Sequence, residues 1–182
     1  MAKIVGIAGS LRVGSYNAAL LRAAVALMPE GSTLEIATIK GIPLYDGDIE
    51  QNDGIPGAVQ DLKERIVAGD ALLLVTPEYN NSIPGVFKNA IDWLSRPPAD
   101  SARVFANRPV ALIGASPGGF GTILSQNAWL PVLRTLGLQP WFGGRLMVSR
   151  AGSVFNEAGE MVDEKARVQL QQFLHGFVGS MK

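Results

Sequence analysis

A loop rich in hydrogen-bond donors follows the first apolar run of the chain. The run ends at Gly9, and three neutral donors and one cation follow it: Ser10, Ser15, Asn17 and Arg12. A helix-like stretch begins at Tyr16, and a helix N-terminus attracts anions through its unpaired backbone N–H groups and its dipole. So many donors suit a terminal phosphate better than a pyrophosphate bridge. We therefore predict a phosphate-monoester site in this loop.

The spacing of the loop excludes two familiar phosphate-binding motifs. No Lys-Ser or Lys-Thr pair follows it, which argues against a nucleoside triphosphate loop of the Walker A type. Its glycines, at positions 6, 9 and 14, do not fall in the register of a dinucleotide fingerprint. The alternative is a turn whose small polar residues only cap the following helix.

A second loop, Pro77–Pro84, has a proline at each end, and each proline restrains the backbone around it. It presents Glu78, Tyr79 and Asn80, an arrangement suited to an extended, flat ligand. Tyrosine supplies an aromatic face with a polar tip, and the backbone supplies N–H donors. The alternative is a rigid turn with Tyr79 packed on the surface.

The elements that must position these loops alternate between strand-like and helix-like segments. Apolar runs that are nearly continuous indicate parallel strands covered on both faces. The expected strands are Lys3–Ala8, Thr33–Ile39, Ala71–Thr76, Pro109–Ala115 and Trp141–Val148. The expected helices are Tyr16–Met28, Ala58–Ala68, Gly85–Ser95, Thr122–Leu136 and Asp163–Val178.

This alternation predicts an α/β fold, a three-layer, doubly wound domain around a five-stranded parallel sheet, with residues 1–182 as a single domain. In such sheets, ligands bind beyond the carboxyl ends of the strands, where the strand order reverses. That rule brings together three loops: Ser10–Asn17, Pro77–Pro84 and Ser116–Gly121.

Composition narrows the function further. Lysine and arginine balance aspartate and glutamate at 16 each, so we expect no nucleic-acid partner, which would demand a basic face. The sequence has no cysteine, and we interpret its single histidine, His175, as structural or solvated. Zinc is therefore not expected. Since no signal pattern or membrane-length apolar run is present, we expect a soluble, cytoplasmic protein without membrane contact.

The long segment Lys40–Gly57 carries turn-forming residues and could border the same cleft. Its acidic side chains are interpreted as a solvated rim, because their order lacks the pattern of a calcium loop. They are Asp46, Asp48, Glu50 and Asp53.

Together these segments resemble the NADPH-dependent FMN reductase family, flavodoxin-like flavoproteins that include quinone, azo-dye and chromate reductases. The resemblance spans the whole chain and rests on motifs in three places. These are Gly9-Ser10-Leu11-Arg12 with Ser15 and Asn17; Pro77-Glu78-Tyr79-Asn80 with Ser82–Gly85 and Lys88–Trp93; and Ser116–Gly121.

Carried over by position, the resemblance implies a bound FMN whose phosphate is held by Ser10, Arg12, Ser15 and Asn17. The flavin ring would lie against Pro77, Glu78, Tyr79 and Asn80, with Ser116, Gly118 and Gly119 on its other side. NADPH or NADH would be the co-substrate. The acceptors would be quinones, azo compounds, free flavin or similar small molecules, with chromate possible.

The chemistry expected from this resemblance is a ping-pong hydride transfer from NAD(P)H through FMN to the acceptor. Because the cofactor carries out this chemistry, we expect no side chain to act as nucleophile or base, and no catalytic residue is assigned. Preference for NADPH requires a cation near the 2′-phosphate, and Arg12, Arg96 and Arg108 are equal candidates at this point.

The segment Thr122–Leu136 has apolar residues around most of its helical circumference, which indicates burial on several sides. The segment Gly85–Ser95 has a wide apolar arc as well. We therefore expect a homodimer or homotetramer, with the alternative that Thr122–Leu136 is a core helix kinked at Pro131. We interpret Trp93 and Trp129 as packing residues.

Two other functions are found among proteins of this architecture. A flavodoxin-type electron carrier, which NAD(P)H reduces slowly, is the alternative to the enzyme. A receiver-like signalling domain is excluded, because Gly9 and Ser10 stand where that class needs clustered aspartates.

Overall fold

The structure, a computed structural model, describes residues 1–181. Its strands are β1 (Ala2–Ala8), β2 (Ser32–Ala37), β3 (Ala71–Val75), β4 (Pro109–Ala115), β5 (Gln139–Pro140) and β6 (Leu146–Val148). Its helices are α1 (Tyr16–Ala26), α2 (Gly47–Asp53), α3 (Gly57–Ala68), α4 (Gly85–Leu94), α5 (Pro98–Phe105), α6 (Ile123–Thr135), α7 (Ala151–Val154) and α8 (Glu164–Gly179).

The sheet is parallel throughout, with strand order β2-β1-β3-β4-β5, and β6 also pairs with β4. In the central pair, Ile4 of β1 stands opposite Ala71 of β3, and Ala8 stands opposite Val75. The order reverses between β1 and β3, since β1 leads to β2 on one side while β3 continues the sheet on the other. The predicted doubly wound α/β fold is confirmed, and its switch point lies where β1 and β3 end.

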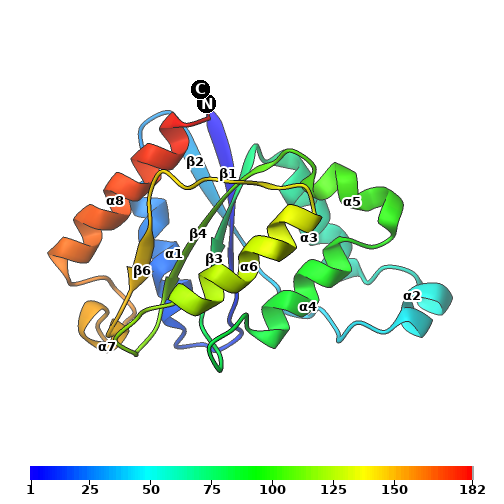
Figure 1. The fold of residues 1–182 in the computed structure, drawn as a ribbon, viewed down its shortest axis with the longest axis horizontal. Helices are drawn as coiled ribbons and strands as arrows, with labels where there is room; N and C mark the ends of the chain where they lie inside the picture. Colours follow the sequence, from blue (N-terminus) through cyan, green and yellow to red (C-terminus); the bar gives the residue numbers. More distant parts are fainter. Residues whose placement is uncertain (182) are drawn as a thin grey trace.

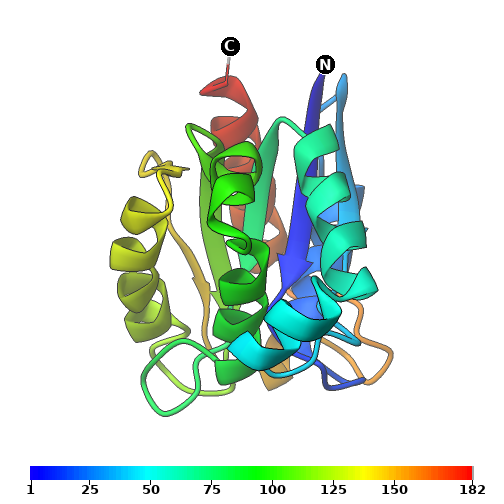
Figure 2. The same ribbon diagram turned by 90° about the vertical axis from the view of Figure 1, so that its right-hand side faces the viewer.

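Helices cover both faces of this sheet (Figures 1 and 2). One core contains α1 and α8 with the side chains of one sheet face, and the other contains α3, α4, α5 and α6 with those of the opposite face. All five side chains of β3 are buried, because that strand has helices on both sides. The three predicted ligand loops emerge at the end of the sheet opposite the N-terminus (Figure 1).

The expected strand Trp141–Val148 is wrong as a single element, because the chain forms β5 and β6 with an interruption between them. The Trp141 ring folds over the intervening backbone, where a Cβ on Gly143 would lie 2.7 Å from the ring. The ring also packs edge-on against Phe173 of α8, with ring centroids 5.0 Å apart. The chain leaves β4 after the two pairs that Gln139 and Pro140 form with it, and it returns to β4 at Leu146.

Three helices were not expected from the sequence. Helix α2 lies inside the segment Lys40–Gly57 and has no buried residue, so it carries no amphipathic signal. It projects from the body of the molecule (Figure 1). Helix α5 begins at two consecutive prolines, Pro97 and Pro98, a start compatible with proline's fixed φ. Helix α7 is a single short turn after β6.

Within residues 1–181, the helices include none that combines the length and the apolar character needed to span a membrane.

Candidate functional site

The loops after β1 and β3 meet at the switch point of the sheet. Gly9 continues the ladder of β1, and its N–H donates to the carbonyl of Val75 at 2.9 Å. The Ser10 and Tyr79 hydroxyl oxygens are 3.5 Å apart, which is the outer limit of a hydrogen bond between the loops. A Cβ on Gly9 would come within 2.1 Å of the Phe87 ring, so glycine is required for α4 to approach β1.

The loop after β1 presents unpaired donors to solvent. Ser15 caps α1, and its hydroxyl accepts from the Ala18 N–H at 3.2 Å. Among the described residues, we find no acceptor for the N–H groups of Tyr16 and Asn17, which stand in the first turn of α1. Arg12 is exposed at the tip of the loop, and none of the ion pairs within residues 1–181 involves it. This set of donors fits an anion with several oxygens.

The side chain of Asn17 is used within the scaffold. It is buried, its amide nitrogen donates to the Ala115 carbonyl at 2.8 Å, and its amide oxygen accepts from the Ala115 N–H at 2.9 Å. These two bonds tie α1 to the carboxyl end of β4. Only the backbone N–H of Asn17 is therefore available for a ligand at this position.

The loop after β3 is shaped by a tight turn. Tyr79 and Ser82 exchange backbone hydrogen bonds of 3.1 and 3.0 Å, and the two residues between them, Asn80 and Asn81, have φ of 50° and 60°. Two positive φ angles in a two-residue connection are typical of a type I′ turn, and asparagine tolerates that conformation. Asn80 thus sets the direction of the loop, while Tyr79 stands 47% exposed at its edge.

Glu78 connects this loop to α6. One oxygen of its carboxylate accepts from the N–H groups of Leu124 and Ser125, at 2.9 and 3.0 Å. A carboxylate at a helix N-terminus satisfies unpaired donors and the helix dipole together. The Glu78 side chain therefore holds the loop against the N-terminus of α6.

A buried polar cluster under the loop escaped sequence reasoning. The Thr76 hydroxyl oxygen accepts from the Trp129 indole N–H at 3.0 Å and lies 2.9 Å from both the Ser125 hydroxyl and the Pro77 carbonyl. Thr76 and Ser125 are fully buried. Their burial inside apolar elements gave no sequence signal except that Thr76 directly precedes Pro77. Trp129 and Trp93 are fully buried, which confirms their interpretation as packing residues.

The third loop, after β4, lies against the chain that follows β6. Ser116 accepts from the Gly118 N–H through its hydroxyl at 3.0 Å, and its carbonyl accepts from the Ala151 N–H at 3.0 Å. A Cβ on Gly119 would meet nothing within 4 Å, so this residue borders open space. Two other glycines near this loop are required by the packing. A Cβ on Gly114 would lie 2.2 Å from the Thr76 carbonyl, and Gly121 has a φ of 63° and would place a Cβ 2.9 Å from Met147.

Two acidic residues of Lys40–Gly57 stabilise the segment that carries α2. Asp46 caps α2, and the carboxylate of Glu50 accepts from the Tyr45 hydroxyl at 2.9 Å and from Arg96 at 2.8 Å. These two bonds, with that from Arg96 the stronger influence, lower the pKa of Glu50 and favour its ionised form. Within residues 1–181, no three metal-ligating side chains come together.

The positive candidates differ in location. Arg96 pairs with Glu50, and Arg108 donates to the carbonyls of Val104 and Gly69, near the amino ends of the strands. Arg12 is thus the cation at the switch point itself. His175 is exposed on α8 and lines a cavity with Met1 and Asp70 at the opposite end of the sheet, far from the three loops.

Three comparisons with known proteins bear on this site. The model of the NADPH-dependent FMN reductase family matches residues 2–153. The chain belongs to that family.

Membership makes the protein an NAD(P)H-dependent oxidoreductase with FMN as its cofactor. The chain is 47% identical over 172 residues to an NAD(P)H-dependent FMN reductase of Pseudomonas aeruginosa, covering 94% of this chain and 91% of the relative. It is 37% identical to a 2-hydroxy-1,4-benzoquinone reductase of Burkholderia sp, covering 94% and 92%. The solved structure of FerB, a flavoenzyme NAD(P)H:(acceptor) oxidoreductase from Paracoccus denitrificans, superimposes with a TM-score of 0.86 at 32% identity and covers 98% and 96%.

Proposed function

We propose that this FMN reductase family member transfers hydride from NAD(P)H to quinones and similar small acceptors in a ping-pong cycle. The observation that carries the proposal is the convergence of three donor-bearing loops at one switch point, next to the free N–H groups of α1. Relatives named for quinone reduction support the acceptor class.

The first loop is proposed to bind the FMN phosphate. Ser10, Arg12 and Ser15 contribute side-chain donors, and Asn17 contributes its backbone N–H, since its side chain is bonded to Ala115. An arginine in such a cup supplies the charge that neutral hydroxyls lack, and charged hydrogen bonds to phosphate are the stronger kind. If the loop only capped α1, the exposed Arg12 and the free N–H groups in the first turn of α1 would have no binding partner within residues 1–181.

The second and third loops are proposed to hold the flavin ring between them. The Pro77–Asn80 backbone lies on one side and Ser116, Gly118 and Gly119 on the other. Bound FMN supplies the hydride chemistry. The chain orients the ring and presents backbone N–H groups to the charge that develops there, and the small residues of the third loop let these N–H groups come close to the ring.

A spectroscopic titration tests this function. The purified protein, loaded with FMN, is mixed anaerobically with NADPH or NADH and then with a benzoquinone, and flavin absorbance is followed in a stopped-flow instrument. The expected result is rapid bleaching by NAD(P)H and rapid recovery with the quinone. A flavin that NAD(P)H reduces only slowly favours the electron-carrier alternative, and a protein that retains no FMN contradicts the site.

We also propose that the working form is a homodimer or homotetramer assembled through the outer face of α6. Ile123 and Leu124 are each 45% exposed there, and Phe142 beside them is 72% exposed. Helix α6 buries only Ser125, Trp129 and Leu133 within its own chain, so the alternative of a fully buried core helix is wrong. The apolar arc of α4, by contrast, is largely buried within the chain.

A further inference from the structure

A large groove lies beside the third loop, between β6 and α8. Its volume is about 830 Å³, and its walls come from β6, the chain around that strand and one face of α8. Figure 1 shows the two elements side by side on the flank of the sheet. The flavin-site residues assigned above do not line it.

Three cations line the groove: Arg145 before β6, Arg150 after β6 and Lys165 in the first turn of α8. None of the ion pairs formed within residues 1–181 involves any of them. The carboxylate among the described lining residues is Asp163, which caps α8 by accepting from the Ala166 N–H at 2.7 Å. The groove therefore carries positive charge that the chain does not neutralise by close pairing.

One end of the groove is joined to the flavin loop through the backbone. The Arg150 N–H donates to the Gly118 carbonyl at 3.0 Å, and the next residue, Ala151, donates to Ser116. Arg150 is held in the left-handed region, with φ of 49°, an uncommon conformation for a residue with a side chain. Arg150 thus lies next to Gly118, one of the residues proposed to border the flavin ring, and also lines the groove.

The other end of the groove offers an aromatic wall. Trp141 lines it together with Phe173, and Arg145 stands close by in the same interruption between β5 and β6. Because Arg145 precedes β6 and Arg150 follows it, the two arginines stand at opposite ends of the strand. A phosphate-binding cation near an indole ring is suited to a purine nucleotide, which presents a flat base and an anion.

We propose that this groove binds the adenosine end of the reductant, with the pyrophosphate at Arg150, the adenine against Trp141 and the 2′-phosphate of NADPH at Arg145. The inference rests on the proposed function and adds the residues that select between NADPH and NADH. Quinones are neutral and carry no phosphate that could pair with the three cations. The positive charge of the groove therefore favours binding of NADPH or NADH over binding of a quinone.

Steady-state kinetics of two FMN-loaded variants test the assignment. Arg145→Gln is expected to lower kcat/KM for NADPH by about 10-fold or more and to leave kcat/KM for NADH within about twofold, because NADH has no 2′-phosphate. Arg150→Gln is expected to lower both values, by about 10-fold, since the pyrophosphate is common to both. Arg167→Gln is the matched control, because Arg167 is exposed on α8, does not line the groove and takes part in none of the ion pairs within residues 1–181.

A binding measurement gives a readout independent of turnover. Isothermal titration of the FMN-loaded wild type with adenosine 2′,5′-bisphosphate is expected to show one site, weakened about 10-fold or more by Arg145→Gln and unchanged by Arg167→Gln. Unchanged selectivity in Arg145→Gln, or absence of bisphosphate binding to a wild type that NADPH reduces rapidly, overturns the groove assignment and leaves the proposed function intact. Bisphosphate binding to a protein whose flavin NADPH does not reduce supports the groove and contradicts the proposed function.

Discussion

Polar side chains that the sequence assigned to a ligand divide into two groups in the structure. Three of them stabilise the fold. Asn17 joins α1 to β4, Glu78 caps α6, and Asn80 forms part of a tight turn. Arg12 is exposed and Ser10 is half-buried, so both are accessible at the end of the sheet. Both groups shape the same site, because the first group fixes the positions of the backbone donors that the second group supplements.

Replacing Arg12 tests the proposed phosphate site in the loop after β1. Arg12→Ala is expected to weaken FMN binding by roughly 1.5–3 kcal/mol, the value of one hydrogen bond to a charged group. FMN fluorescence quenching on titration of the apoprotein measures it, with Arg167→Ala, at an exposed position on α8, as the control. Normal FMN retention in Arg12→Ala would contradict the assigned role.

Glu78 is expected to act through position. Glu78→Ala removes the acceptor from two amides of α6 and should lower the free energy of unfolding by roughly 1.5–3 kcal/mol, measured by urea denaturation. FMN affinity should fall as well, because the loop loses its attachment. Glu78→Gln keeps an acceptor oxygen and should restore most of both quantities. Equal losses in the two variants would instead indicate that the negative charge itself is required.

At the level of elements, α5 is fastened to α3 by a buried lysine. The Lys63 side chain is fully buried and donates to the Arg96 carbonyl and to the Asp100 carboxylate, the latter at 2.9 Å. Asp100 also accepts from Arg103 at 2.7 Å. Hydrogen bonds from Arg103 and then Lys63 lower the pKa of Asp100 from 3.8 to about 2.

This pair predicts a pH-dependent stability. A carboxylate whose pKa is lower in the folded state stabilises the fold above its unfolded pKa, and the contribution is lost as pH falls through the folded value. Asp100→Asn is expected to lower the free energy of unfolding by roughly 1.5–3 kcal/mol at pH 7. The difference from wild type should shrink as the pH is lowered from about 4 to about 2, the window that the lowered pKa defines. Denaturation at several pH values measures it, with Asp61→Asn as the control, and a constant difference would contradict the assignment.

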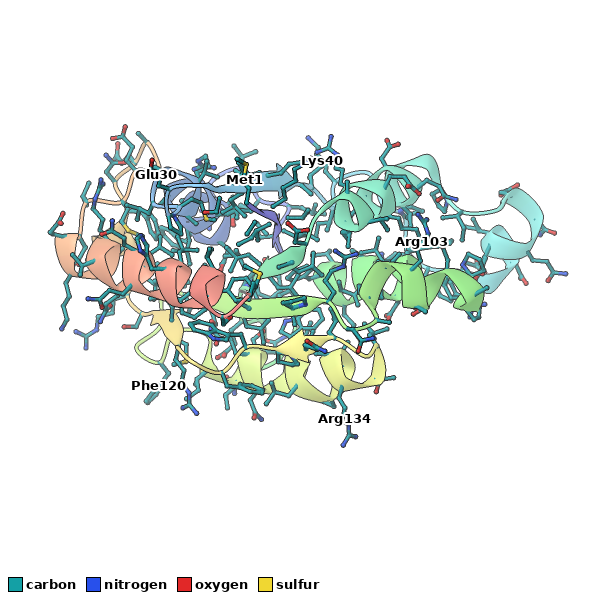
Figure 3. All side chains as sticks on the ribbon, turned by 90° about the horizontal axis from the view of Figure 1, so that it is seen from above. Met1, Glu30, Lys40, Arg103, Phe120 and Arg134 are labelled. Atoms are coloured by element: carbon teal, nitrogen blue, oxygen red, sulfur yellow. The ribbon has the colours of Figure 1, made fainter. Side chains whose placement is uncertain are left out.

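At the scale of the whole molecule, the proposed assembly depends on the outer face of α6. Figure 3 shows Phe120, on the loop that leads into α6, and Arg134, near the end of the helix, on the same side of the molecule. Exposed apolar side chains gather beside this helix: Ile123 and Leu124, with Phe142 from the neighbouring loop. An exposed apolar surface of this kind is typical of a protein–protein contact.

Disrupting that face should dissociate the assembly. Phe142→Glu places a charge in the contact and is expected to shift the mass measured by light scattering after size exclusion toward the monomer. Val168→Glu, on the exposed side of α8, is the control for a charge added at another exposed apolar position. A wild type that is monomeric at micromolar concentration would refute the proposal.

The sequence by itself determined the fold and the three loops. Apolar runs that alternate with amphipathic segments are local patterns, so the strands β1 to β4 and the main helices could be predicted within a few residues. The loops follow from the same patterns, because parallel strands bring their carboxyl ends to one edge. The turn of the chain at Trp141 could not be predicted, since Trp141 packs against Phe173 of the distant helix α8. Helix α2 could not be predicted because it buries no side chain and so has no amphipathic pattern.

Only the tertiary structure decided which polar groups at that edge are already hydrogen-bonded within the chain. Asn17 and Ala115 are 98 residues apart, and Glu78 is 46 residues from Leu124, so their pairing has no local signal. The same holds for the groove, whose cations lie on separate segments with no common motif. Residue type shows that a side chain is able to hydrogen-bond a phosphate. Its neighbours in space decide whether that side chain is already hydrogen-bonded to the backbone, as Asn17 is to Ala115.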